Sequence, residues 1–287
     1  MSPQPKAATP KSFLDTSIVH KIQLGTSQIQ EYLRSAIPQK WYINNYVRME
    51  YFRHSLIIWI NLYFESADAK HKTFGDAWKL FSEGFGREAK IAVSALTTME
   101  ADGFSFAKEE DKPFCRGKLQ DFIYSMALQF EEMFTDMGGD PTHCTRLRQA
   151  LRVPDEATER DGQLLKVARI FQNEKECRSL CSIARFFTAV THKPKFSAMA
   201  VATTTGKTVP KLKKIQEAVG EATKDPDAIT CMTCSKMGDA VIASALDASW
   251  KLHSLDTVHV PISSALRIEC EIHPSEKALA KRTAGGA

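Results

Sequence analysis

The sequence lacks any apolar stretch long enough to cross a lipid bilayer. Its most hydrophobic run, residues 56–64, is about half of the roughly 20 residues that a membrane-spanning helix needs. Residues 1–11 also lack the continuous apolar core of a secretory signal, and their proline, alanine and lysine content predicts a disordered tail. We therefore expect no membrane association and a cytoplasmic protein.

An excess of charge of one sign is also missing. The 38 basic and 34 acidic residues leave a net charge of only +4, which identifies no partner by itself. A nucleic acid can still be held by a local group of basic side chains. One such group lies in residues 206–222, a predicted helix whose first half carries Lys207, Lys211, Lys213 and Lys214. It is interpreted either as a solvated helix surface or as a set of phosphate contacts.

Two common catalytic signatures are absent. The tripeptide Gly206-Lys207-Thr208 resembles the end of a phosphate-binding P-loop, but Val201 stands where the first glycine of that motif belongs. ATP binding at this segment is therefore rejected. None of the eight histidines lies in a recognisable nucleophile motif. A reaction that uses a side chain as its nucleophile is not indicated.

The hydrophobic pattern predicts an α/β protein with a mainly helical middle. Residues 12–14 form a short apolar strand that leads into Asp15, and residues 18–33 follow as a helix with Thr16 or Ser17 at its N-cap. Residues 40–49 are rich in β-prone side chains, which would place Glu50 at a second strand-to-helix junction. Further helices are predicted at about 74–99, 117–137 and 163–190.

Two more acids follow near the C-terminal end of the sequence. Asp239 lies in the first turn of a predicted helix, and a short strand over residues 251–255 ends at Asp256. If the strands are parallel neighbours, Asp15, Glu50, Asp239 and Asp256 converge at one edge of the sheet. Four carboxylates at one place repel one another unless a cation joins them, and hard cations such as Mg²⁺ or Mn²⁺ prefer oxygen ligands. Phosphodiester hydrolysis by metal-activated water is the reaction that this arrangement favours.

Three segments around these acids resemble PIN-domain nucleases. Residues 13–18, Phe-Leu-Asp-Thr-Ser-Ile, resemble the opening strand and acidic turn of that family. Residues 238–243 resemble its third acidic motif, residues 252–256 resemble the strand and acid that follow, and residues 47–50 give the weakest match. The resemblance implies that Asp15, Glu50, Asp239 and Asp256 are catalytic metal-site acids and that Thr16 or Ser17 supports the cofactor pocket.

The resemblance also implies a domain organisation. It predicts a PIN-like three-layer α/β/α catalytic core with a central, mainly parallel sheet, built from residues 12–70 and 228–270. Residues 71–227 would form a mainly helical insertion, and residues 271–287 a C-terminal tail. An insertion of this size can cover or redirect the active-site cleft, so the motifs do not identify the substrate.

Seven cysteines, an odd number, fit reduced thiols better than a disulfide framework. Cys177 and Cys181 are one helical turn apart, and Cys231 and Cys234 form a tight pair just before Asp239. Four thiolates can hold a structural Zn²⁺. The preferred interpretation is that these cysteines are reduced and behave as small hydrophobic side chains.

The expected function is therefore a metal-dependent endoribonuclease, a class that includes the toxins of toxin–antitoxin pairs. RNA is the expected partner. The insertion offers a surface for an antitoxin or another protein, and homo-oligomers occur in the family that the chain resembles. A structure-specific DNA nuclease is one alternative, and a catalytically silent PIN-like module that binds RNA or protein is another.

Overall fold

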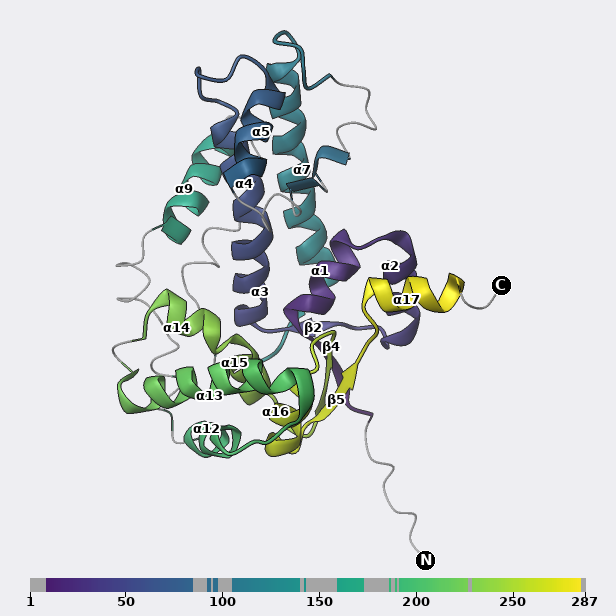
Figure 1. The fold of residues 1–287 in the computed structure, drawn as a ribbon, viewed down its shortest axis with the longest axis vertical. Helices are drawn as coiled ribbons and strands as arrows, with labels where there is room; N and C mark the ends of the chain where they lie inside the picture. The colour runs from purple at the N-terminus through teal and green to yellow at the C-terminus, as the bar shows by residue number, and fades with distance from the viewer. Residues whose placement is uncertain are drawn as a thin grey trace, which may run out of the picture. The chain divides into compact units, whose positions relative to one another are not determined.

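The computed structural model of the protein forms two compact units, each described here by itself (Figure 1). The structure describes residues 9–84, 92–93, 95–97, 105–139, 142, 159–172, 186, 189, 191–226 and 229–284. The first unit comprises Met1–Arg48, Phe134–Cys144 and Cys177–Ala287, and the second comprises Met49–Met133 and Thr145–Glu176.

The described residues of the first unit form a five-stranded sheet in which every strand pairing is parallel. The strand order is β3-β2-β1-β4-β5. The strands are β1 (Lys11–Leu14), β2 (Tyr42–Ile43), β3 (Thr135–Asp136), β4 (Trp250–Ser254) and β5 (Glu269–Ile272). The central pair, β1 and β4, joins the two ends of the sequence, with Leu14 in register with His253.

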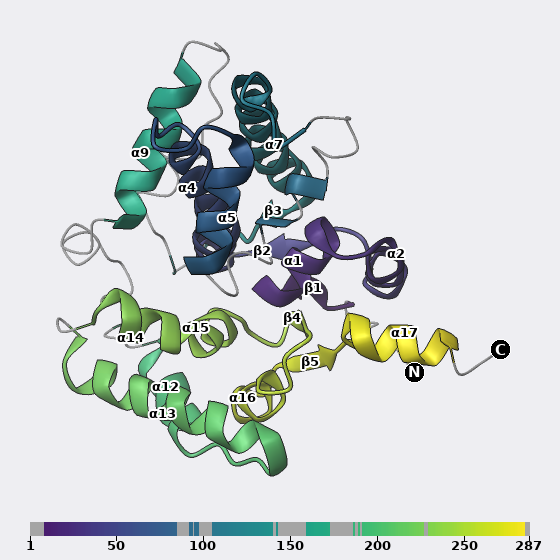
Figure 2. The same cartoon turned by 45° about the horizontal axis from the view of Figure 1, so that its top comes forward.

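Helices cover both faces of this sheet (Figure 2). One side carries α1 (Thr16–Leu24), α2 (Ser27–Ala36) and α17 (Glu276–Ala284). The other side carries α12 (Lys193–Ala200), α13 (Val209–Lys224), α14 (Cys231–Lys236), α15 (Gly238–Ser244) and α16 (His259–Leu266). A short 3₁₀ turn, η3 (Gly206–Thr208), precedes α13, and α3 (Asn45–Tyr51) follows β2. The α/β class and the parallel central sheet are therefore confirmed.

Local chemistry explains how β1 leads into the helices that follow it. Phe13 and Leu14 are fully buried, as expected of a central strand that is covered on both faces. The chain then turns at Asp15, which is the N-cap of α1 and accepts a hydrogen bond from the backbone N–H of Ser17. The first helix ends at Gly25, where a Cβ atom would lie 2.4 Å from Ile29 Cγ2.

The described residues of the second unit form helices joined by turns. They form a π-helical stretch η1 (Phe52–Leu56), α4 (Ile57–Glu65), α5 (Phe74–Gly84), α7 (Lys112–Met133) and α9 (Arg160–Gln172). An aromatic cluster holds α7 against the start of η1, because the ring of Phe130 stacks on Tyr51 with centroids 4.8 Å apart. Across the described part of the chain, no helix combines the length and the apolar character that crossing a membrane requires.

Three predicted segments differ from the structure. Residues 18–33 form two helices, α1 and α2, and it is Asp15 rather than Thr16 or Ser17 that caps the first. Residues 40–49 hold the short strand β2 and the start of α3, so Glu50 lies in the last turn of α3 and not at a strand end. The predicted N-terminal tail ends earlier than expected, because β1 begins at Lys11.

The boundaries of the units also differ from the predicted ones. A helical unit does interrupt the α/β unit, but it begins at Met49 and not at residue 71, and the segment from Cys177 onward belongs with the sheet. The predicted tail over residues 271–287 is wrong for most of its length. Its first residues complete β5, and its next residues form α17, whose Glu276 accepts a hydrogen bond of 2.8 Å from the Thr26 backbone N–H.

Candidate functional site

The strand order places a topological switch point at the carboxyl ends of β1 and β4. From β1 the chain continues through α1 and α2 to β2 on one side, and from β4 it continues through α16 to β5 on the other. The two crossovers diverge at this point, and open α/β sheets bind their ligands at such a switch point. Asp15 follows β1 directly, and its backbone N–H donates to the His253 carbonyl group at 3.0 Å.

The Asp15 side chain is buried and held in one orientation. It is 4% exposed, and its Oδ2 accepts hydrogen bonds from Ser17 Oγ at 2.6 Å and from Ser254 Oγ at 2.8 Å. Ser17 Oγ in turn accepts from the Leu255 backbone N–H at 3.1 Å, which ties the loop after β4 to the start of α1. The two hydroxyl groups occupy Oδ2 and thereby fix the direction of Oδ1.

His259, in the first turn of α16, lies between Asp15 and Asp239. Its Nε2 atom is 3.6 Å from Asp15 Oδ1 and 3.2 Å from Asp239 Oδ1, and the ring is fully buried. Among the described residues, neither ring nitrogen has a partner with good hydrogen-bond geometry. Its contact with the two carboxylates is therefore chiefly electrostatic.

The charges of neighbouring side chains determine which members of this group are protonated. Burial alone raises the pKa of the Asp15 carboxyl group, but the positive charge of His259 and the bonds from the two serines hold that pKa below its usual value. Burial likewise raises the pKa of Asp239, and His259 and Lys211 lower it to a value below normal. Burial lowers the pKa of His259, whereas the two carboxylates raise it well above its usual value. At neutral pH the group is thus two carboxylates and an imidazolium.

Lys211, in the first turns of α13, joins the third acid to this group. Its Nζ atom lies 2.8 Å from Asp239 Oδ2 and also contacts Asp256 Oδ2. Burial lowers the pKa of Lys211, but the two carboxylates outweigh that effect and raise it. Asp256 is positioned by its own loop, since its Oδ1 accepts from the Val258 backbone N–H at 3.0 Å. Asp15, Asp239 and Asp256 therefore meet in one ionic network with two cationic side chains.

The donor atoms of this group fit a divalent ion. One atom each from Asp15, Asp239 and His259 lie within 4.8 Å of one another, which is close enough to ligate the same ion. The two carboxylates suit Mg²⁺ or Mn²⁺, and an imidazole ligand would favour Mn²⁺ over Mg²⁺. His259 can ligate only when it is neutral, because a protonated ring has no lone pair to offer. Binding an ion here therefore requires the loss of the His259 proton.

The predicted site residues fall into two groups. Asp15, Asp239 and Asp256 come together in the first unit, and Ser17 holds Asp15 in place. Thr16 is buried in the first turn of α1. Glu50 is assigned to the second unit, so its part in the site stays a prediction.

The zinc prediction for the cysteines also stays untested. Cys177 and Cys181 lie outside the described residues, and Cys231 begins α14. Cys234 is buried, and its Sγ atom lies 3.7 Å from the Tyr46 hydroxyl group.

Sequence reasoning missed His259 and Lys211 as members of the site. A weak signal existed for His259, which lies three residues, or about one helical turn, after Asp256. Lys211 belongs to a run of lysines, and nothing in that run distinguishes it from its neighbours. Both are identified only by contacts with residues distant in the sequence.

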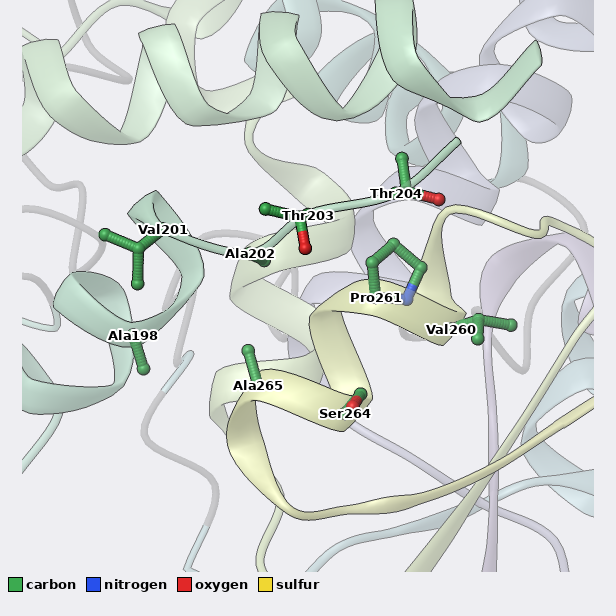
Figure 3. Close-up of a pocket in the computed structure, with 9 residues that line it drawn as sticks. All are labelled: Ala198, Val201, Ala202, Thr203, Thr204, Val260, Pro261, Ser264 and Ala265. Atoms are coloured by element: carbon green, nitrogen blue, oxygen red, sulfur yellow. The ribbon is translucent and has the colours of Figure 1, made fainter. Parts of the chain in front are cut away.

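A pocket of about 490 Å³ lies beside α16 (Figure 3). Small apolar and hydroxyl side chains of α12, of residues 201–204 and of α16 line it, among them Thr203, Pro261 and Ser264. The acidic group lies outside this pocket, since none of the lining residues carries a carboxylate or an imidazole.

Comparison of the chain with protein-family models, with curated proteins and with solved structures finds no match.

Proposed function

We propose that this protein is a divalent-metal-dependent nuclease with a PIN-like α/β core, and that it cleaves RNA by metal-activated water. The observation that carries the proposal is the meeting of Asp15 and Asp239 at the switch point of the sheet, both within 3.6 Å of His259 Nε2. These acids come from opposite ends of the sequence, from two of the segments that resemble PIN-domain motifs. The choice of RNA rests on that resemblance.

Each residue of the network has a defined part in this proposal. Asp15, Asp239 and the neutral form of His259 hold the ion, and Asp256 completes the acidic surface next to them. Ser17 and Ser254 keep the Asp15 carboxylate in one orientation. A bound divalent ion supplies a lowered pKa for water and neutralises charge on the phosphodiester. The Lys211 side chain is 46% exposed and lies beside Asp239. Once its ammonium group leaves the carboxylates, it can contact a phosphate group of a substrate bound at the ion.

Basic side chains next to the acids support a polyanionic substrate. Lys207, Lys213 and Lys214 are exposed on η3 and α13, the same segment that carries Lys211. This segment lies beside the loop after β4, because Thr208 Oγ1 is 3.0 Å from Thr257 Oγ1. Lysines that flank an acidic site can hold the phosphates on either side of a scissile bond.

The test is cleavage of labelled single-stranded RNA, single-stranded DNA and flap DNA by the full-length protein. We expect RNA cleavage with Mn²⁺, a weaker reaction with Mg²⁺ and none with a chelator. Asp15→Asn and Asp239→Asn should each lower the rate by roughly 100-fold or more, because loss of even a residue that supports a metal ligand costs about 10- to 100-fold. Asp225→Asn, an exposed acid at the end of α13, is the matched control and should cleave normally.

Metal-independent cleavage that survives in both variants would defeat the proposal. Cleavage of flap DNA alone would keep the metal chemistry but change the substrate to DNA.

One observation favours a second function, a catalytically silent module that binds nucleic acid. His259 and Lys211 already place positive charges against the three carboxylates, so the site is close to neutral without a metal ion. A silent module would bind RNA with the same affinity whether Mn²⁺ is present or not, and it would leave the RNA intact. Gel-shift titrations run beside the cleavage assay distinguish the two functions.

A further inference from the structure

A second group of ligand-type side chains lies on β4 and on the edge strand β5 of the sheet. His253 of β4 is in register with Glu271 of β5, and His273 comes directly after β5, two residues after Glu271. Side chains two residues apart on a strand share a face, so Glu271 and His273 extend from the same face. Neither histidine nor Glu271 belongs to the Asp15, Asp239 and His259 group.

The three side chains are close enough to bind one ion. His253 Nδ1 lies 3.0 Å from His273 Nε2 and 3.9 Å from Glu271 Oε2, and one ligand atom from each residue lies within 4.8 Å of the others. Two nitrogens on a tetrahedral zinc ion, at about 2.0–2.1 Å from the metal, are about 3.3 Å apart. The histidine pair therefore needs only a small adjustment to bind zinc.

The two histidines of this group are buried, and Glu271 is partly exposed to solvent. His253 is fully buried and His273 is 2% exposed, whereas the Glu271 side chain is 41% exposed. The imidazoles would form the inner side of a site and the carboxylate its outer side. An ion held there could keep a water molecule on the solvent side as its fourth ligand.

Burial disfavours the charged form of both imidazoles, so each ring keeps one nitrogen with a lone pair. The proton shared between His253 Nδ1 and His273 Nε2 would move to the other nitrogen of its ring when both atoms bind an ion. Burial, together with the nearby His273, lowers the pKa of His253 to about 4. Burial also lowers the pKa of His273. The second nitrogen of His273, Nδ1, lies 3.5 Å from the Tyr32 hydroxyl group, which can orient the ring as outer partners of metal-bound histidines do.

We propose that His253, Glu271 and His273 form a binding site for Zn²⁺, with His253 Nδ1, His273 Nε2 and a Glu271 carboxylate oxygen as ligands. Two imidazoles and one carboxylate suit zinc better than Mg²⁺ or Ca²⁺, which prefer oxygen. The site joins β4 to the segment that follows β5, and it would stabilise the edge of the sheet. It does not depend on the nuclease proposal.

Lys251 is the main competitor for Glu271. Its Nζ atom lies 2.9 Å from Glu271 Oε2 and 2.8 Å from Glu269 Oε1. Zinc binding would remove the first ion pair and leave the second in place. Because Lys251 keeps Glu269, and because partly exposed ion pairs contribute little stability, this competition is weak.

The test uses the full-length chain with Asp15→Asn and Asp239→Asn, so that the first site cannot bind the ion. After chelator treatment, Zn²⁺ is added in a calorimeter and Co²⁺ in a spectrophotometer. We expect one Zn²⁺ per chain, visible absorption bands of tetrahedral Co²⁺ and a higher Tm with Zn²⁺. His273→Gln should weaken Zn²⁺ binding by roughly 100-fold, at the upper end of the effects seen even for outer-sphere partners.

Two further variants keep the result interpretable. Asp225→Asn changes an exposed acid outside the ligand set and should bind Zn²⁺ normally. Glu271→Gln changes an exposed ligand, so it tests the site even if the buried His273 variant fails to fold. The proposal is overturned if the folded protein binds no Zn²⁺, which would mean that the histidines only share a hydrogen bond. Binding that His273→Gln and Glu271→Gln both leave unchanged would overturn it as well.

Discussion

His259 is a buried cation between the buried carboxylate of Asp15 and the partly buried carboxylate of Asp239. Its ring is fully buried, and Asp15 is only 4% exposed, so little water is available to solvate these charges. Removing one member of such a group leaves the others without compensation in a medium of low polarity. The histidine therefore stabilises the fold in the metal-free protein, whatever it does during a reaction.

Replacing this histidine should change how stability depends on pH. The folded-state pKa of His259 lies well above its ordinary value of 6.5, so its contribution is complete below that value and is lost as the pH rises through the folded-state pKa. We expect His259→Gln to lower the free energy of unfolding by roughly 3–5 kcal/mol at neutral pH. The difference from the unmodified protein should shrink in alkaline solution, as urea unfolding at a series of pH values would measure.

A double variant provides the control for this experiment. Asp239→Asn combined with His259→Gln removes a charge of each sign and should lose less stability than the sum of the two single variants. Strict additivity would show that the two charges do not interact.

Metal binding at the same residue should release a proton. Because His259 is protonated at neutral pH and must be neutral to ligate, we expect Mn²⁺ to displace about one proton per ion bound. Mn²⁺ affinity should accordingly increase as the pH rises toward the His259 pKa. Calorimetric titrations in two buffers with different ionisation enthalpies measure the proton count, and His259→Gln should release none. An equal release from both proteins would assign the proton to another group.

The joint between α1 and α2 depends on close packing at Gly25. A Cβ atom there would lie 2.4 Å from Ile29 Cγ2 and 2.5 Å from the Lys21 carbonyl oxygen, which is part of the backbone. We expect Gly25→Ala to destabilise the protein by roughly 1–3 kcal/mol in urea unfolding, since overpacking forces neighbouring atoms to move.

Gly220, inside α13, has no atom within 4 Å of a Cβ position and is the matched control. Gly220→Ala should be neutral or stabilise the protein by about 0.5–1 kcal/mol, because alanine favours helix. Equal losses in the two variants would mean that contacts at Gly25 are not the cause.

The first turns of α13 carry a lysine that competes with any metal ion. Lys211 neutralises Asp239 and Asp256, and its side chain is 46% exposed. We expect Lys211→Gln to tighten Mn²⁺ binding by about two- to fivefold, the effect of losing a partly exposed ion pair, and to weaken RNA binding. Lys214→Gln changes an exposed lysine on the same helix that is not part of the acidic network, so it should weaken RNA binding only. Unchanged Mn²⁺ affinity in the Lys211 variant would place the ion away from Asp239.

Helices and strands were predictable where a short stretch of sequence determines them. The β1 strand and the turn at Asp15 follow from a short apolar run and a capping residue. The aromatic and β-branched side chains of residues 40–49 favour a strand over the whole segment, but only β2 forms there. The strand is short because Asn44 Oδ1 accepts a hydrogen bond from the Val47 backbone N–H at 2.9 Å and starts a helix. Helix α17 was not predicted, because its many alanines and lysines indicate a tail that does not pack. The contact that holds the helix, an ion pair between Glu276 and Lys21, joins residues far apart in the sequence.

At the scale of the whole molecule, the three aspartates were predictable and their partners were not. Each aspartate lies at the end of a strand or the start of a helix, and parallel strands bring such positions to one edge. Lys211 and His259 depend on how helices from separate segments pack, which no local pattern records. The division into units was misplaced for the same reason, since hydrophobic periodicity does not tell which helices share a core.

Because β1 pairs with β4 in the centre of the sheet, synthesis on the ribosome separates the two halves of the site in time. Lys11 is translated long before its partner Trp250, and at about 5–20 residues per second the delay is on the order of 10–50 seconds. During that interval the nascent chain has Asp15 but neither Asp239 nor Asp256. A ribosome-bound fragment that ends before Asp239 therefore cannot assemble the acidic network.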